Sequence, residues 1–108
     1  MDRAGRILQR YQEVSRFSVQ MRDAARQGRW DDLIALERAR ESQVAELKRD
    51  LGQGAVPPEV ASQVGALIAA ILEMDGETQE LAVSWKGELK GLLESVNTER
   101  KLSQTYGP

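Results

Sequence analysis

Residues 58–96 read PEVASQVGALIAAILEMDGETQELAVSWKGELKGLLESV, and the apolar positions of this stretch decide the fold. One row of positions, almost all apolar, recurs every three or four residues along it: Val60, Val64, Leu67, Ile71, Met74, Thr78, Leu81, Trp85, Leu89, Leu92 and Val96. This spacing predicts one face of a single long helix. Pro58 suits the first turn of that helix, and Glu59 favours the positive end of the helix dipole. If the helix continued to Ser103, it would be about 67 Å long at 1.5 Å per residue.

Two shorter helices are expected before this stretch, at about 3–27 and 31–51. Both carry apolar residues at helical spacing. Gly28 is expected to end the first helix in a left-handed conformation, which costs a residue without a Cβ little. Asp31 and Asp32 then favour the start of the second helix. Because the link is so short, the two helices should lie antiparallel.

These lengths do not match, since helices of about 37 Å and 31 Å cannot cover one of about 67 Å. The chain could break at Asn97-Thr98, which favour helix caps, and form a short fourth helix at about 98–106. Otherwise the second half of the long helix exposes an apolar strip of the kind that marks partner or dimer surfaces. That strip consists of Leu81, Trp85, Leu89, Leu92 and Val96. We predict an all-α fold for 1–108, a single domain formed by an antiparallel three-helix bundle with a long third helix.

A charged pair interrupts the apolar stripe of the second helix. Glu37 and Arg40 are three residues apart and can reach each other. A charged pair on an apolar seam is costly unless it is well satisfied. In the alternative, the seam rotates, Leu36 and Ala39 face the core, and the pair is solvated.

Charge is unevenly distributed along the chain, although the formal net charge is only −2. Residues 1–51 carry eleven Lys/Arg and nine Asp/Glu, whereas residues 52–108 carry four and eight. Between Glu59 and Glu80 there are five acidic residues and no basic one. Two interpretations stay open: helix faces of opposite sign that attract each other, or an acidic face for a basic partner.

Composition argues against catalysis and cofactors. The chain has no Cys and no His, so thiolate chemistry, the usual neutral-pH base and the commonest metal ligands are absent. It has no phosphate-binding glycine loop and no net basic surface for nucleic acid. No apolar run reaches the length of a signal peptide or a membrane span, so we expect a cytoplasmic protein without membrane contact.

Several short motifs resemble the FliT family of flagellar export chaperones. They are Tyr11-x-x-x-Ser15, Met21, Ala24-Ala25, the block Gly28-x-Trp30-Asp31-x-Leu33-x-x-Leu36-Glu37-x-x-Arg40, and the ending Leu102-Ser103-Gln104-Thr105-Tyr106-Gly107. The resemblance implies a small helical cytoplasmic protein that binds the filament-capping protein and delivers it to the type III export apparatus. It also implies contacts with the master flagellar transcriptional activator and the export ATPase.

Carried over by matching segments, the resemblance implies self-association, as a homodimer, through about 1–50. The motif residues there are Tyr11, Met21, Trp30, Asp31, Leu36, Glu37 and Arg40. It implies binding of the capping protein by about 60–98, with candidate residues Leu81, Trp85, Leu89, Leu92 and Val96, joined by Ile68 and Leu72. Members with an autoinhibitory C-terminal helix continue well past the Tyr-Gly, so we expect that switch to be reduced here.

Two other functions stay open. A generic helical adaptor or dimerisation module fits the same helices and predicts a partner unrelated to flagella. A transcriptional regulator that contacts DNA directly would need binding that falls steeply with salt, and the absence of a net basic surface argues against it.

Overall fold

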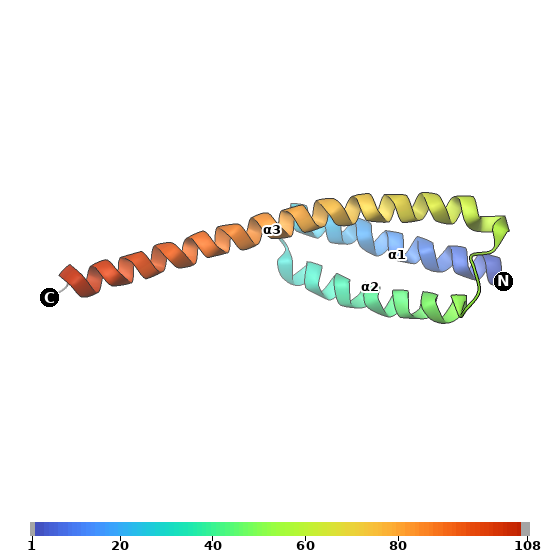
Figure 1. Ribbon diagram of the computed structural model, residues 1–108, viewed down its shortest axis with the longest axis horizontal. Coiled ribbons are helices and arrows are strands. Elements are labelled where there is room, and N and C mark those ends of the chain that lie inside the picture. The colour runs from blue at the N-terminus through green and yellow to red at the C-terminus, as the bar shows by residue number, and fades with distance from the viewer. Residues whose placement is uncertain (1, 107–108) are drawn as a thin grey trace. The chain divides into compact units, whose positions relative to one another are not determined.

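The computed structural model describes the backbone of residues 2–106 and the side chains of residues 2–100. It contains α1 (Arg3–Arg26), α2 (Trp30–Leu51), a short 3-10 helix η1 (Pro58–Val60) and α3 (Ala61–Tyr106), shown in Figure 1. The described residues include no strand, and the all-α prediction is confirmed. None of their helices is long and apolar enough to span a membrane.

The chain divides into two compact units, Met1–Thr78 (unit 1) and Gln79–Pro108 (unit 2). Unit 1 contains α1, α2, η1 and the part of α3 up to Thr78, and unit 2 contains the rest of α3. The grouping of both units into one domain stays a prediction.

Consecutive helical segments of unit 1 run in opposite directions (Figure 1). Arg10, near the start of α1, donates to Asp50 at the end of α2 over 2.9 Å. Arg40 in α2 reaches Asp75 in α3 over 2.7 Å. The link from α1 to α2 turns at Gly28, whose φ of 70° is the left-handed conformation that the sequence predicts.

The core of unit 1 is built around α1. The buried apolar side chains are Ile7, Val14, Met21, Ala24 and Ala25 of α1, Leu33 and Leu47 of α2, Val60 of η1, and Val64 and Met74 of α3. Two polar side chains are buried with them, Ser18 and Thr78. Each hydroxyl donates to the carbonyl four residues earlier in its own helix, which removes the cost of an unpaired polar group.

Specific contacts hold the helix ends of unit 1. The Asp2 carboxylate accepts a hydrogen bond from the Gly5 N–H at 2.8 Å and so caps α1. The Arg3 guanidinium donates to the carbonyls of Leu51 and Ala55, which ties the start of α1 to the loop after α2. A Cβ on Gly54 would lie 2.8 Å from that guanidinium, so a larger residue there would require the Arg3 side chain to shift.

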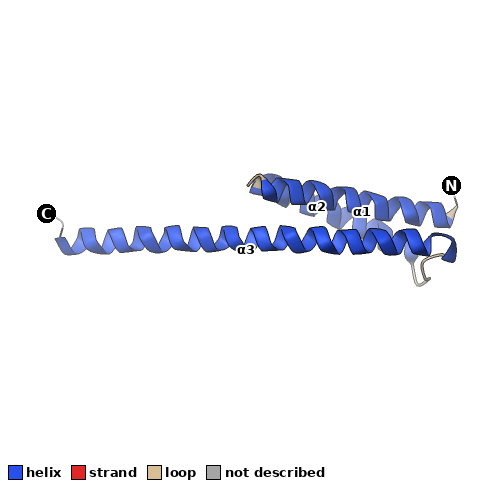
Figure 2. Ribbon diagram, turned by 90° about the horizontal axis from the view of Figure 1, so that it is seen from above, coloured by secondary structure: helices blue, strands red, loops and turns tan. Residues whose placement is uncertain are grey.

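The α3 helix is drawn as one unbroken helix (Figure 2), and its range, Ala61–Tyr106, includes Asn97 and Thr98. The alternative of a break there, with a short fourth helix at 98–106, is therefore wrong. The Thr98 hydroxyl donates to the Glu94 carbonyl at 2.9 Å, so this polar side chain is accommodated inside the helix. A weak preference for capping positions does not end a helix whose hydrogen bonds continue on both sides.

Candidate functional site

The predicted partner-binding strip lies on α3 in unit 2, and we call Leu81, Trp85, Leu89, Leu92 and Val96 the unit 2 strip. Its last three members are exposed, with 44% of the Leu89 surface, 62% of Leu92 and 50% of Val96 accessible. Leu81 and Trp85 are partly exposed. The strip thus offers a row of accessible aliphatic side chains at helical spacing, the geometry that receives an apolar partner.

Two further large apolar side chains of unit 2 are exposed but were not among the predicted site residues. Val83 is 62% accessible and Leu93 is 61% accessible. Leu93 lies beside Leu92 and widens the strip, and its place next to the apolar stripe was visible in the sequence. Val83 is nine residues before Leu92, which is about two and a half turns of helix. It therefore lies on the opposite side of α3 from Leu92.

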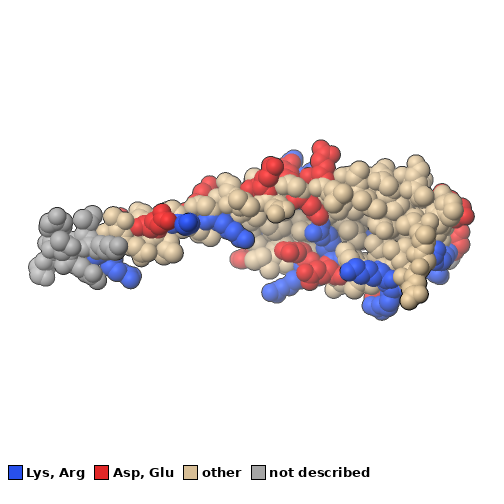
Figure 3. Space-filling model, viewed as in Figure 1, with Lys and Arg blue, Asp and Glu red and all other residues tan. Residues whose placement is uncertain are grey.

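A second exposed apolar surface lies on the part of α3 in unit 1. No residue between Val60 and Leu72 is charged, and Figure 3 shows this part of α3 as a region without Lys, Arg, Asp or Glu. The predicted site residues Ile68 and Leu72 are 38% and 66% accessible there. Val64, one helical turn before Ile68, is 2% accessible and belongs to the core.

The motif residues of α1 and α2 do not form one surface. Met21 is 4% accessible and packs in the core of unit 1. Tyr11, Trp30, Leu36 and Arg40 are partly buried, whereas Asp31 and Glu37 are exposed. The motif therefore mixes residues that hold unit 1 together with residues on its surface. Self-association through this segment stays a prediction.

Arg40 is the centre of a polar cluster that joins all three helices of unit 1. One nitrogen of its guanidinium, Nη1, donates to both carboxylate oxygens of Asp75, at 2.7 and 2.9 Å, and to the Ser18 hydroxyl at 2.8 Å. The Arg40 and Asp75 side chains are only 20% and 33% exposed. Of the two interpretations left open for Glu37 and Arg40, the structure shows neither a mutual pair nor a fully solvated one, since Arg40 pairs with Asp75. Asp75 is the better partner because it also satisfies the arginine inside the helix interface, whereas Glu37 lies on the exposed face of α2.

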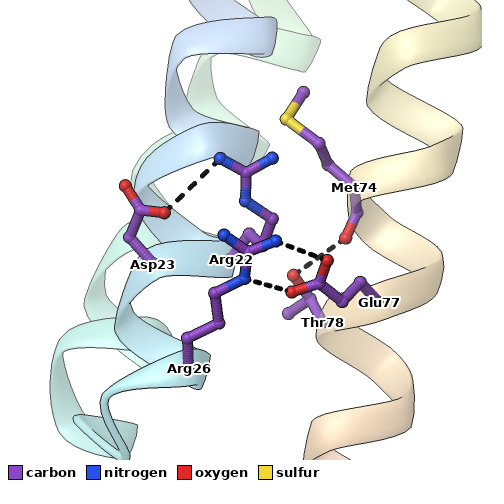
Figure 4. A network of polar contacts seen from close by, with 6 residues as sticks. All are labelled: Arg22, Asp23, Arg26, Met74, Glu77 and Thr78. Atoms are coloured by element: carbon purple, nitrogen blue, oxygen red, sulfur yellow. Dashed lines mark hydrogen bonds and ion pairs between the residues drawn. The ribbon is translucent and has the colours of Figure 1, made fainter.

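A second ion pair joins the end of α1 to α3 (Figure 4). The Arg26 guanidinium donates to both carboxylate oxygens of Glu77, over 2.7 Å in the bond from Nη2. These hydrogen bonds lower the pKa of Glu77 and raise that of Arg26. Beside them, Arg22 reaches Asp23 at 3.5 Å, and the Thr78 hydroxyl donates to the Met74 carbonyl at 3.0 Å. Sequence reasoning missed this pair because it joins residues 51 positions apart.

The described part of the candidate site consists mainly of accessible apolar side chains. In the part of the chain that the structure describes, no three Asp or Glu side chains come together as metal ligands. The carboxylates of Asp50, Asp75 and Glu77 are each engaged by an arginine. What the geometry offers to a partner is accessible apolar area on α3.

Comparison with known proteins places this geometry in context. The family model described as "Flagellar protein FliT" matches residues 8–108. A curated protein of Serratia proteamaculans (strain 568), also described as "Flagellar protein FliT", is 27% identical over 107 residues. That alignment covers 99% of this chain and 88% of the relative. No solved structure matches the chain.

Proposed function

This chain belongs to the FliT family of flagellar proteins, and on that premise we propose that it is a flagellar export chaperone. Its client is the filament-capping protein, which it binds before type III export. The observation that carries the proposal is the exposed aliphatic row of the unit 2 strip, Leu89, Leu92 and Val96. A protein that shields an apolar client segment needs such a row.

The proposed mechanism is non-catalytic. A client segment that forms an amphipathic helix lays its apolar side chains on the unit 2 strip, with anchors three or four residues apart. Burial of apolar surface contributes about 25 cal/mol per Å², and ordering of the client segment opposes it. Alternating charges flank the strip, with Lys86 and Lys90 interspersed with Glu88 and Glu94. Such mixed charges keep the exposed row in solution until a client covers it.

The family premise supports further proposals. The protein binds the master flagellar transcriptional activator and inhibits it by direct protein contact. It also contacts the export ATPase, self-associates through residues 1–50 and acts in the cytoplasm. Ile68 and Leu72, exposed on the part of α3 in unit 1, add a second apolar surface for one of these partners.

The test is co-purification of the co-expressed filament-capping protein with the full chain and two matched variants. Leu92→Asp places a charge on the unit 2 strip, and Val83→Asp places one on the opposite side of α3, with both parent residues 62% accessible. We expect capture by the unchanged chain and by Val83→Asp, and loss in Leu92→Asp. Circular dichroism confirms that both variants remain helical.

Other outcomes would change the conclusion. Capture by Leu92→Asp as well would keep the chaperone function but contradict the unit 2 strip as its site. Failure of the folded, unchanged chain to capture the capping protein would overturn the proposal. The generic helical adaptor would then be the better interpretation.

A further inference from the structure

A groove in unit 1 combines an apolar floor with an acidic edge. It is lined by residues of α2 and α3, with one residue of α1, and has a volume of about 270 Å³. Its lining residues are Val14, Glu37, Arg40, Glu41, Val44, Ile71 and Asp75. Val14 is buried at the floor, and Val44 and Ile71 are partly exposed. Figure 3 shows acidic and basic side chains along the same gap.

The charges of this groove do not cancel. Arg40 is the single cation that lines it, and both carboxylate oxygens of Asp75 already accept hydrogen bonds from it. Glu37 and Glu41 are exposed, and within the described part of the chain neither has an ion-pair partner. They are also one helical turn apart, where like charges repel each other and destabilise the helix. The charged residues that line the groove therefore carry a net charge of −2.

This combination selects one kind of occupant. A small inorganic cation would leave the apolar floor unused, and an aliphatic side chain would leave the carboxylates unbalanced. Lysine and arginine carry a positive head on an apolar stem and place the two parts in different surroundings. We propose that this groove binds a lysine or arginine side chain presented by a basic segment of a partner protein. Its stem packs on Val44 and Ile71, and its head lies between Glu37 and Glu41.

The surface is separate from the unit 2 strip and does not rest on the export-chaperone proposal. The neighbouring part of the chain makes the surroundings of the groove more negative. From Glu59 to Glu80 it contains five acidic residues and no basic one. An electrostatic contact of this kind speeds association and selects among partners, and it weakens as salt is added.

The first experiment uses the full chain and n-butylammonium, which is the lysine side chain without its backbone. We expect n-butylammonium to shift the methyl NMR signals of Val44 and Ile71 and the amide signals of Glu37 and Glu41. n-Propylguanidinium is the arginine counterpart, and it shows which head the groove prefers. n-Butanol and sodium chloride serve as controls for the stem and for the charge. Equal shifts with n-butanol, or shifts spread over unit 1, would overturn the proposal.

The second experiment measures affinity for a helical alanine-based peptide with one central lysine flanked by leucines. Its matched peptide has norleucine, which is uncharged and similar in length, in place of the lysine. We expect the lysine peptide to bind about 3- to 10-fold more tightly in low salt, the range of one or two exposed ion pairs. Replacing both Glu37 and Glu41 by Gln should remove this difference, while Glu59→Gln, on η1, should preserve it.

The outcomes separate this proposal from the proposed function. Equal affinity for the two peptides, or an unchanged preference in the Glu37→Gln, Glu41→Gln variant, would refute the groove. Leu92→Asp, which should abolish capture of the capping protein, should leave the lysine preference intact. Both glutamates are exposed, so their variants should keep the fold, which circular dichroism verifies.

Discussion

Replacing Arg40 by Met should destabilise unit 1 by about 2 kcal/mol. The arginine donates three hydrogen bonds, two to Asp75 and one to Ser18, between 2.7 and 2.9 Å. A hydrogen bond to a charged group contributes about 1.5–3 kcal/mol when buried, and an exposed ion pair at most about 1 kcal/mol. With side chains 20% and 33% exposed, the Arg40–Asp75 pair falls between these limits. Because Met preserves most of the apolar stem, the loss of stability measures the contribution of the polar contacts.

A double-mutant cycle with Asp75→Asn isolates the pair. The free energy of unfolding is measured by urea titration, followed by circular dichroism at pH 7, for the unchanged chain, both single variants and the double variant. We expect a coupling energy of about 1–2 kcal/mol between Arg40 and Asp75. Arg38→Met, an exposed arginine of the same helix, is the control and should change stability by less than about 0.5 kcal/mol.

One result would refute this reasoning directly. If Arg40→Met costs the same in the Asp75→Asn background as in the unchanged chain, the coupling energy is zero. The two side chains would then contribute to stability independently. In that case the contact between the two side chains would not stabilise the fold.

Three other perturbations test separate parts of unit 1. Ile7→Ala, at a fully buried position, should cost about 2–5 kcal/mol in a urea titration, whereas Ile34→Ala, at 49% exposure, should cost far less; equal losses would contradict the assigned core. Glu77→Gln should lower the melting temperature at pH 7. Because the fold lowers the pKa of Glu77, its stabilising contribution is present above the usual carboxyl pKa and is lost as pH falls through the lowered value. Thermal melts should therefore converge with those of the unchanged chain at low pH, and a constant difference across pH would exclude the charge as the cause. Asp2→Ala removes the acceptor for the Gly5 N–H and should cost about 0.5–2 kcal/mol, most of which Asp2→Asn should restore; no loss in Asp2→Ala would contradict the cap.

Local patterns in the sequence were sufficient to place the first two helices. The predicted ranges, 3–27 and 31–51, differ from Arg3–Arg26 and Trp30–Leu51 by one residue at the end of the first helix and one at the start of the second. Gly28 was identifiable because a link this short needs a residue that tolerates positive φ. These features depend on neighbours within one or two helical turns, which a single sequence displays.

Contacts between distant residues could not be inferred in the same way. Arg40 had Glu37 within reach along its own helix, and only the packing of α3 against α2 brings Asp75 to it, 35 residues away. The side of the helix that meets a neighbour is set by the whole core, so local spacing alone left the partner of Arg40 open. The exposure of Leu89, Leu92 and Val96 was easier to predict, because the expected third helix is longer than two shorter helices can cover. Their role in binding a partner stays a prediction.

The run of α3 without basic residues has a consequence for proteolysis. Trypsin cleaves after lysine and arginine, and the next such residue after Arg49 is Lys86. Limited digestion with trypsin therefore has no cleavage site in η1 or in the part of α3 that belongs to unit 1. Within unit 2, Lys86 and Lys90 are exposed and flank Leu89. The rates of cleavage after Lys86 and Lys90 report local opening of α3 at the strip. If a client added to the protein slowed cleavage at both sites, its binding would be detected without a label.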